Sequence, residues 1–302
     1  MNIAISGSTG FIGNNLCNFL DKNKNINIIL ISRISSINDN SYSYDDFFAG
    51  NINERIDVFI HLASPNYDYC NDDSLKNGIV NLTKNILRNL ENYECKKFIY
   101  FSSCKVYGES SINNIIFNES SELNPISDYA KAKAEAEFIV SDISSKKNIS
   151  FLIYRLPFVY GNGMKSNLKN LLNLIDKSFP FILINNKSSL KRSFLCIDNL
   201  NKTLIYNIEN LHSINNSIFN LSDNNSITLN DFLNDYKKVS KSKTIFLRFP
   251  IIFFIVLSKI PILGNIILKI YGSFDIDNSM FKKNTHLSLL STSEGIQYLD
   301  NK

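Results

Sequence analysis

The chain has 302 residues, of which 44% are hydrophobic and 20% charged, and 32 Lys and Arg against 28 Asp and Glu give a net charge of +4. Apolar runs continue along the whole chain, which excludes a disordered protein, and the length allows one large α/β domain with a smaller lobe. The basic residues are scattered, so we expect no nucleic-acid partner. Five cysteines without a CxxC pair predict free thiols in a cytoplasmic protein and no metal site.

Strand and helix patterns alternate through the first half of the chain. Apolar runs predict strands at 2–6, 26–31, 57–62, 97–102 and 150–155, and helical spacing predicts helices at 11–20, 75–90 and 127–144. Because the first strand begins at residue 2 with no charged leader before it, we expect no signal peptide. The alternation predicts an α/β fold, a Rossmann-type doubly wound parallel sheet with helices on both faces. Ligands of such sheets bind beyond the carboxyl ends of the strands.

Beyond about residue 160 the pattern becomes mixed. Helices are expected at 167–176, 198–209 and 228–239, and strands at 181–184, 193–197 and 217–221. We therefore predict a nucleotide-binding domain over residues 1–160 and a smaller C-terminal lobe over residues 161–302. This lobe is expected to bind the substrate and to be interleaved with the first domain.

One hydrophobic segment raises the question of a membrane. Residues 249–270 read FPIIFFIVLSKIPILGNIILKI, and their uninterrupted apolar run covers only residues 251–257. A spanning helix needs roughly 20 mostly apolar residues. We therefore expect a helical hairpin that packs on the body of the protein or rests on a membrane surface, and a peripheral membrane contact through 249–270 stays open.

A glycine-rich turn joins the first predicted strand to the first helix. Gly7, Gly10 and Gly13 have GxxGxxG spacing. Gly7 permits the tight turn, Gly10 lets a pyrophosphate approach the backbone, and Gly13 lets the helix pack on the sheet. The N–H groups at the helix start, including those of Phe11 and Ile12, favour phosphate charge together with the helix dipole. The turn predicts a dinucleotide site, and a purely structural turn is the alternative.

The end of the second strand bears on the choice of cofactor. An acidic residue there would bind the adenosine ribose 2′-hydroxyl, but the chain has Ser32 and Arg33. A serine and an arginine suit a 2′-phosphate, which slightly favours NADP(H) over NAD(H). The alternative is that Arg33 stacks on the adenine or is merely exposed.

Two further motifs follow in order. Tyr129 and Lys133 are four residues apart near the start of a predicted helix, which places them on one face. A nearby ammonium lowers the pKa of a phenol, so Tyr129 is expected to exchange protons near neutral pH. The run FSSCKVYG at 101–108, at the end of a strand, offers a hydroxyl to the substrate oxygen that Tyr129 serves.

Six motifs together resemble those of one family. They are GSTGFIG at 7–13, HLA at 61–63, SSCKVYG at 102–108, YAKAK at 129–133, RLPFVYG at 155–161 and RSFLCIDNL at 192–200. The chain resembles, over nearly its whole length, the extended short-chain dehydrogenases/reductases, in their NAD(P)-dependent epimerase/dehydratase branch acting on nucleotide sugars. The resemblance implies that Ser103 orients the substrate, that Tyr129 is the acid/base, and that Lys133 holds the nicotinamide ribose. It also implies cofactor contacts at Leu62 and Ala63.

The same resemblance implies two substrate contacts. Asn167 and Arg192 are expected to bind the nucleotide diphosphate, and a planar guanidinium suits phosphate. The alternative for Arg192 is a surface charge at a strand edge. Asp198 is expected to cap a helix and His61 to be a packed strand residue.

The resemblance also limits the reaction. Family 4,6-dehydratases carry a Thr-Asp-Glu run, and this chain has Ser103, Cys104 and Lys105 instead, which argues against dehydration. Chemistry at C4 remains. Family epimerases usually have an acid where Ser32 stands, and many have asparagine where Phe158 stands. We therefore predict 4-ketosugar reduction on a UDP-linked hexose for cell-surface polysaccharide synthesis. A 4-epimerase with retained NAD, a non-catalytic dinucleotide sensor and a homodimer stay open.

Overall fold

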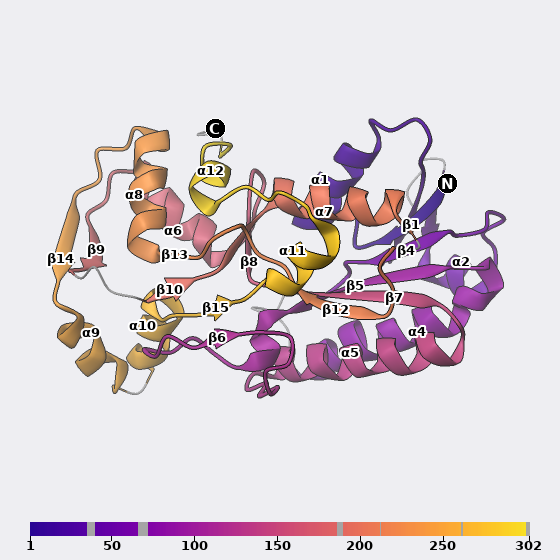
Figure 1. Cartoon of the computed structure of the whole chain (residues 1–302), viewed down its shortest axis with the longest axis horizontal. Helices are drawn as coiled ribbons and strands as arrows, with labels where there is room; N and C mark the ends of the chain where they lie inside the picture. Colours follow the sequence, from indigo (N-terminus) through magenta and orange to yellow (C-terminus); the bar gives the residue numbers. More distant parts are fainter. Residues whose placement is uncertain (35–39, 66–71, 186–189, 212, 261, 300–302) are drawn as a thin grey trace. The chain divides into compact units, whose positions relative to one another are not determined.

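The computed structural model describes residues 1–34, 40–65, 72–185, 190–211, 213–260 and 262–299 (Figure 1). The chain forms two compact units. Unit 1 comprises Met1–Gly108, Glu122–Leu156 and Asn201–Phe219, and unit 2 comprises Glu109–Ser121, Pro157–Leu200 and Asn220–Lys302. Each unit is thus assembled from three separate stretches of the chain.

Unit 1 is built on a seven-stranded sheet with the strand order β12-β7-β5-β4-β1-β2-β3. The strands are β1 (Asn2–Ser6), β2 (Asn27–Ser32), β3 (Ser41–Ser43), β4 (Val58–His61), β5 (Lys97–Ser103), β7 (Ser150–Leu156) and β12 (Ser217–Asn220). The pairings from β7 to β3 are all parallel. The order reverses at β1, and the α/β, Rossmann-type fold predicted from the alternating pattern is confirmed.

Helices cover both faces of this sheet (Figure 1). They are α1 (Phe11–Leu20), α2 (Tyr44–Ala49), α3 (Asp72–Leu75), α4 (Leu82–Asn89), α5 (Asp128–Lys146) and α7 (Ile197–Glu209). In the view of Figure 1, α4 and α5 lie below the sheet and α1 and α7 above it. The strands are accordingly buried on both faces: β4 is buried throughout and β5 over all but its last residue.

The predicted helix at 75–90 is present but interrupted. A π-helical segment, η2 (Lys76–Asn81), separates α3 from α4, and a 3₁₀ turn, η3 (Leu90–Tyr93), follows α4. A Cβ atom on Gly78 would lie 2.3 Å from the Cγ atom of Pro65, so the wide turn lets the helix approach that ring. The helix α2 was not predicted, although its capping box, in which Ser43 and Asp46 bond each other's backbone N–H groups, is visible in the sequence.

Unit 2 contains four two-stranded sheets and several short helices. The pairs are β10 (Lys191–Arg192) with β13 (Ile227–Thr228), β11 (Phe194–Cys196) with β8 (Phe158–Tyr160), β14 (Phe246–Phe249) with β9 (Phe181–Ile184), and β15 (Asp275–Ile276) with β6 (Ile116–Phe117). The helices are α6 (Asn167–Asp176), α8 (Leu229–Ser240), α9 (Ile251–Ser258), α10 (Leu263–Tyr271), α11 (Ser279–Thr285) and α12 (Thr292–Ile296).

A buried polar centre joins the segments of unit 2. The hydroxyl of Tyr160 donates to Asp223 at 2.9 Å and to the carbonyl of Thr292 at 3.0 Å. Asp223 also accepts from the backbone N–H of Cys196 and from the side chain of Asn199, each at 2.7 Å. Every polar partner is thereby satisfied inside an otherwise aromatic core.

The hydrophobic segment at 249–270 forms two short helices, α9 and α10, as the interrupted apolar run predicted. Among the described residues, no helix is long and apolar enough to cross a membrane.

Candidate active site

The glycine turn after β1 is shaped by contacts that only glycine permits at two of its three positions. Gly7 has a φ of +81°, and a Cβ atom there would lie 2.6 Å from the amide nitrogen of Ala63. A Cβ atom on Gly13 would lie 2.3 Å from the carbonyl oxygen of Gly7. Because these neighbours are backbone atoms, larger residues would displace the turn from the sheet.

Gly10 differs from Gly7 and Gly13, because its backbone conformation and surroundings do not require glycine. Its φ of −72° and ψ of 169° suit any residue. A Cβ atom on it would meet only the oxygen of Gly7, at 3.3 Å. The fold therefore gives little reason for glycine here, whereas close approach of a pyrophosphate gives one. No side chain caps α1 at Gly10, and the first N–H groups of a helix have no partner within it. The turn thus fits the phosphates of a dinucleotide.

Two alanine variants are expected to separate the roles of these glycines. Gly13→Ala should destabilise the protein by about 1–3 kcal/mol, because its methyl group overlaps backbone. Gly10→Ala should melt near the parent temperature but bind NAD(H) or NADP(H) at least about tenfold more weakly, a change of ~1.4 kcal/mol. Thermal denaturation and cofactor titration measure the two effects. Parental cofactor affinity in Gly10→Ala would remove the pyrophosphate from this turn.

β2, which lies next to β1 in the sheet, ends at Ser32, and Arg33 follows it directly. The Ser32 hydroxyl donates to the carbonyl of Ile34 at 2.6 Å, and Arg33 is exposed. Burial raises the pKa of Tyr44 to about 12, opposed by its hydrogen bond with Ser6 and by the charge of Arg33.

The segment after β4 supports the turn from the other side. Leu62 donates its backbone N–H to Ser6 at 3.0 Å, and Ala63 packs against Gly7. His61 is buried between the hydroxyls of Ser6, at 2.6 Å, and Thr83, at 3.0 Å. Burial, followed by the nearby Lys133, lowers the pKa of His61 to about 3. His61 is therefore a neutral, packed strand residue, as expected.

Ser103 and Tyr129 lie close together in unit 1. Ser103 is the last residue of β5, and Tyr129 lies in the first turn of α5, which the side chain of Ser127 caps. Ser103 lies close enough to Tyr129 to lower the pKa of its phenol. Ser103 also accepts from the backbone N–H of Lys105 at 3.3 Å, whereas the Ser102 hydroxyl is buried without a hydrogen-bond partner. Of the two serines, Ser103 is the one that reaches Tyr129.

Lys133 lies one helical turn beyond Tyr129 and is buried. Its Nζ atom donates to the carbonyl of Phe101 at 2.8 Å and lies 5.9 Å from the centre of the Tyr129 ring. Burial lowers the pKa of Lys133 to about 7, and the carboxylate of Glu137 opposes this. The side chain is therefore only partly charged at neutral pH.

The pKa of Tyr129 differs from the expectation. Burial raises it to about 12, Cys104 adds to the rise, and the hydrogen bond with Ser103 opposes it. A lowering by Lys133 was expected from the four-residue spacing. Lys133 is not among the groups that shift this pKa, and burial dominates because desolvation disfavours the charged forms of the phenol and of the ammonium alike.

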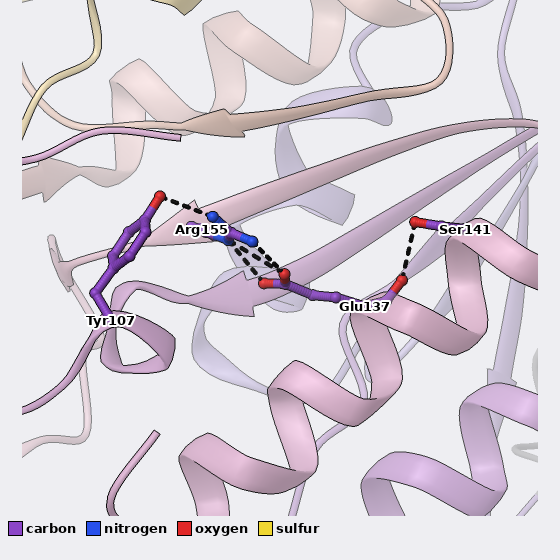
Figure 2. A network of polar contacts seen from close by, with 4 residues as sticks. All are labelled: Tyr107, Glu137, Ser141 and Arg155. Carbon is purple, nitrogen blue, oxygen red and sulfur yellow. Dashed lines mark hydrogen bonds and ion pairs between the residues drawn. The ribbon is translucent and has the colours of Figure 1, made fainter. Parts of the chain in front are cut away.

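A buried ion pair that was not predicted from the sequence joins α5 to β7 (Figure 2). Arg155 on β7 donates to both carboxylate oxygens of Glu137 on α5, with the shortest contact at 2.6 Å, and to the hydroxyl of Tyr107 at 2.8 Å. Both charged side chains are only 4% exposed. The network ties α5 to the strand beside β5 and so fixes the helix that carries Tyr129 and Lys133. Its one sequence signal is the RLP motif at 155–157.

The two predicted substrate contacts belong to unit 2. Asn167 is the first residue of α6 and is exposed. Arg192 is buried and donates to the carbonyls of Lys269, at 2.9 Å, and Gly272, at 2.8 Å. Its guanidinium thus satisfies carbonyls at the end of α10. This role is neither of the two that the sequence suggested, a diphosphate contact and a surface charge at a strand edge. Contact of either residue with a nucleotide stays a prediction.

The described part of the chain contains no group of three or more His, Cys, Asp or Glu side chains that could hold a metal ion. Four cysteines are free thiols, namely Cys17, Cys95, Cys104 and Cys196, and Cys70 lies outside the described residues.

Known proteins resemble the chain in sequence and in fold. A Dictyostelium discoideum protein named dTDP-D-glucose 4,6-dehydratase is 33% identical over 239 residues, which cover 66% of this chain and 53% of that protein. The chain thus matches about half the length of this relative. A Vibrio cholerae protein named UDP-glucose 4-epimerase is 25% identical over 301 residues, which cover 93% of this chain and 88% of that protein.

Among solved structures, UDP-glucuronic acid 4-epimerase from Bacillus cereus, in complex with NAD, shares the fold with a TM-score of 0.76. It is 20% identical, and the match covers 99% of this chain and 97% of that one. Residues 3–222 match the model of the NAD dependent epimerase/dehydratase family. Because this match spans more than half of its residues, the chain belongs to the NAD dependent epimerase/dehydratase family.

Proposed function

We propose that the chain inverts the configuration at C4 of a UDP-linked hexose as an NAD(P)-dependent 4-epimerase. The observation that carries the proposal is the placement of three side chains in unit 1: Ser103 ends β5, Tyr129 lies near it in the first turn of α5, and Lys133 is buried one turn further along α5. The Vibrio cholerae relative whose match spans nearly the whole chain bears the name of such an enzyme, which supports the assignment.

The chain's own residues have three roles in this reaction. Tyr129 exchanges a proton with the oxygen on C4, and Ser103 hydrogen-bonds that oxygen and orients it. Lys133 holds the ribose next to the nicotinamide. When bound, the dinucleotide supplies hydride exchange at C4. Positioning and proton transfer are therefore what the protein contributes, and Asn167 and Arg192 stay predicted contacts of the nucleotide diphosphate.

Reduction of a preformed 4-ketosugar is the second candidate. The observation that favours it is the pair Ser32 and Arg33 at the end of β2, because a reductase consumes its cofactor and a cationic residue there suits NADPH. Dehydration is disfavoured, because Cys104 and Lys105 offer no carboxylate beside Ser103. Either remaining reaction would supply a sugar donor for cell-surface polysaccharide synthesis.

The cofactor preference follows from the same two residues. Arg33 is exposed directly after β2, and a cationic side chain there suits a 2′-phosphate, which favours NADP(H). The Bacillus cereus structure contains NAD, which favours the opposite choice. Titration of the purified chain with NADP⁺ and NAD⁺ decides between them, and tighter binding of NAD⁺ would contradict the role given to Arg33.

One set of assays tests the function. The purified chain, with its bound cofactor identified, is incubated with UDP-glucose, UDP-GlcNAc and UDP-4-keto-6-deoxy-GlcNAc. The proposal expects C4 epimers of at least one of the first two, without net change of cofactor. Stoichiometric NADPH consumption with the ketosugar alone would overturn the epimerase in favour of the reductase. A chain that binds the cofactor and turns over none of the three would be a sensor.

A further inference from the structure

The hairpin of α9 and α10, together with β14, is a firmly attached part of unit 2. Phe254 is 4% exposed and packs against the ring of Tyr271, with ring centres 4.6 Å apart. A Cβ atom on Gly264 would lie 2.1 Å from the carbonyl oxygen of Ser258, so the two helices touch. Arg192 holds the end of α10 through the Lys269 and Gly272 carbonyls. These contacts fix the inner side of the hairpin.

The outer side of the α9–α10 hairpin and of β14 is apolar. Ile252 is 61% exposed, Val256 57% and Ile262 80%. The other exposed apolar side chains of this stretch are Ile245, Leu247, Phe249, Phe253, Ile260, Leu263 and Ile266. A helix that is apolar all round is normally buried, and α9 (IIFFIVLS) has only Ser258 as a polar residue. Exposed apolar side chains gathered on one short element in this number mark an interaction site.

The charged residues within the stretch that forms this surface are all of one sign. Residues 241–274 contain no Asp or Glu and five cations, which exceeds the net charge of +4 of the whole chain. The five are Lys241, Lys243, Arg248, Lys259 and Lys269, and all are exposed. A second copy of the chain would bring like charges together across such an interface, which is unfavourable. The partner of this face must accept apolar side chains and must carry negative charge. A surface that presents both hydrocarbon and negative charge meets these two requirements.

We propose that α9, α10 and β14 seat the protein on an anionic lipid surface, beyond any catalytic role. The apolar side chains enter the boundary between headgroups and acyl chains, and the five cations meet lipid phosphates. The helices have 8 and 9 residues. At 1.5 Å per residue each is about 12–14 Å long, far short of the ~30 Å hydrocarbon core, so they lie in the interface and do not span it.

Tryptophan fluorescence tests the proposal directly, because the chain contains no tryptophan. Ile252→Trp places one reporter on the outer side of α9. Phe138→Trp places another at the control position on α5, which is 72% exposed. Vesicles of phosphatidylcholine mixed with phosphatidylglycerol should shift the emission of Ile252→Trp to the blue and leave that of Phe138→Trp unchanged. Equal responses of the two variants, or none, overturn the proposal.

Vesicle flotation with charge variants supplies an independent measurement. Arg248→Glu combined with Lys259→Glu should reduce the bound fraction on the anionic vesicles at least about tenfold. The control Lys202→Glu, at an exposed position of α7, should bind as the parent does. Binding should fall at high salt and on phosphatidylcholine alone. Flotation that neither charge reversal nor salt weakens contradicts the anionic surface, and a concentration-dependent dimer that Ile252→Asp abolishes would assign the face to a second copy.

Discussion

Replacing Tyr129 with phenylalanine is expected to reduce turnover by a factor of about 10² to 10⁴, the range that a positioned acid/base contributes. The substitution removes one oxygen atom, that of the phenol whose pKa Ser103 lowers. The ring remains packed in unit 1, so the free energy of unfolding should fall by only ~1 kcal/mol. The measurement is kcat on the accepted UDP-sugar, together with the Kd for the cofactor, which should stay near the parental value.

Tyr298→Phe is the matched control, because Tyr298 is 59% exposed and loses the same atom. Its kcat and melting temperature should equal those of the parent. Near-normal turnover in Tyr129→Phe would remove Tyr129 from the reaction. Loss of cofactor binding in that variant would instead mean that the hydroxyl serves the fold of the site and not its proton transfer.

The strands of unit 1 were predictable because they are buried on both faces. VFIH at 58–61 is buried at every residue and KFIYFSS at 97–103 at all but the last, and strands buried on both faces appear in a sequence as mostly apolar runs. The glycine turn was predictable because its constraints are local. A side chain on Gly13 would meet the backbone of Gly7, and a side chain on Gly7 would meet the backbone of Ala63, just after the neighbouring strand β4. Ser103, Tyr129 and Lys133 were singled out by the resemblance of their motifs to those of one family, and their roles stay predictions.

Contacts between distant residues were not predictable. Arg192 and Lys269 are 77 positions apart, and nothing in their local sequence shows that one side chain satisfies the other's carbonyl. Glu137 and Arg155 are 18 apart, on a helix and a strand whose packing decides the pair. The pKa of Tyr129 was misjudged for the same reason, because burial is a property of the packed fold and not of the four-residue spacing to Lys133.

Breaking the buried pair is expected to have the largest effect on stability. Glu137→Gln keeps the shape of the side chain but leaves the Arg155 guanidinium buried without its counter-charge. The free energy of unfolding should fall by about 3–5 kcal/mol, which for a chain of this size lowers the melting temperature by roughly 6–20 °C. The matched control is Asp142→Asn, because the pair of Asp142 with Lys146 is exposed. This variant should change the free energy of unfolding by less than about 1 kcal/mol.

Two further measurements separate charge burial from simple loss of packing. Glu137→Gln combined with Arg155→Met leaves no unpaired charge, so this double variant should recover part of the loss. Glu137 also raises the pKa of Lys133 against the effect of burial. Without that carboxylate the pKa of Lys133 falls further. As the pH rises, steps that need the Lys133 ammonium should therefore be lost at a lower pH than in the parent. A pH profile of cofactor affinity measures this shift. A double variant less stable than Glu137→Gln, with an unchanged pH profile, would show that the pair acts through its shape and not through its charges.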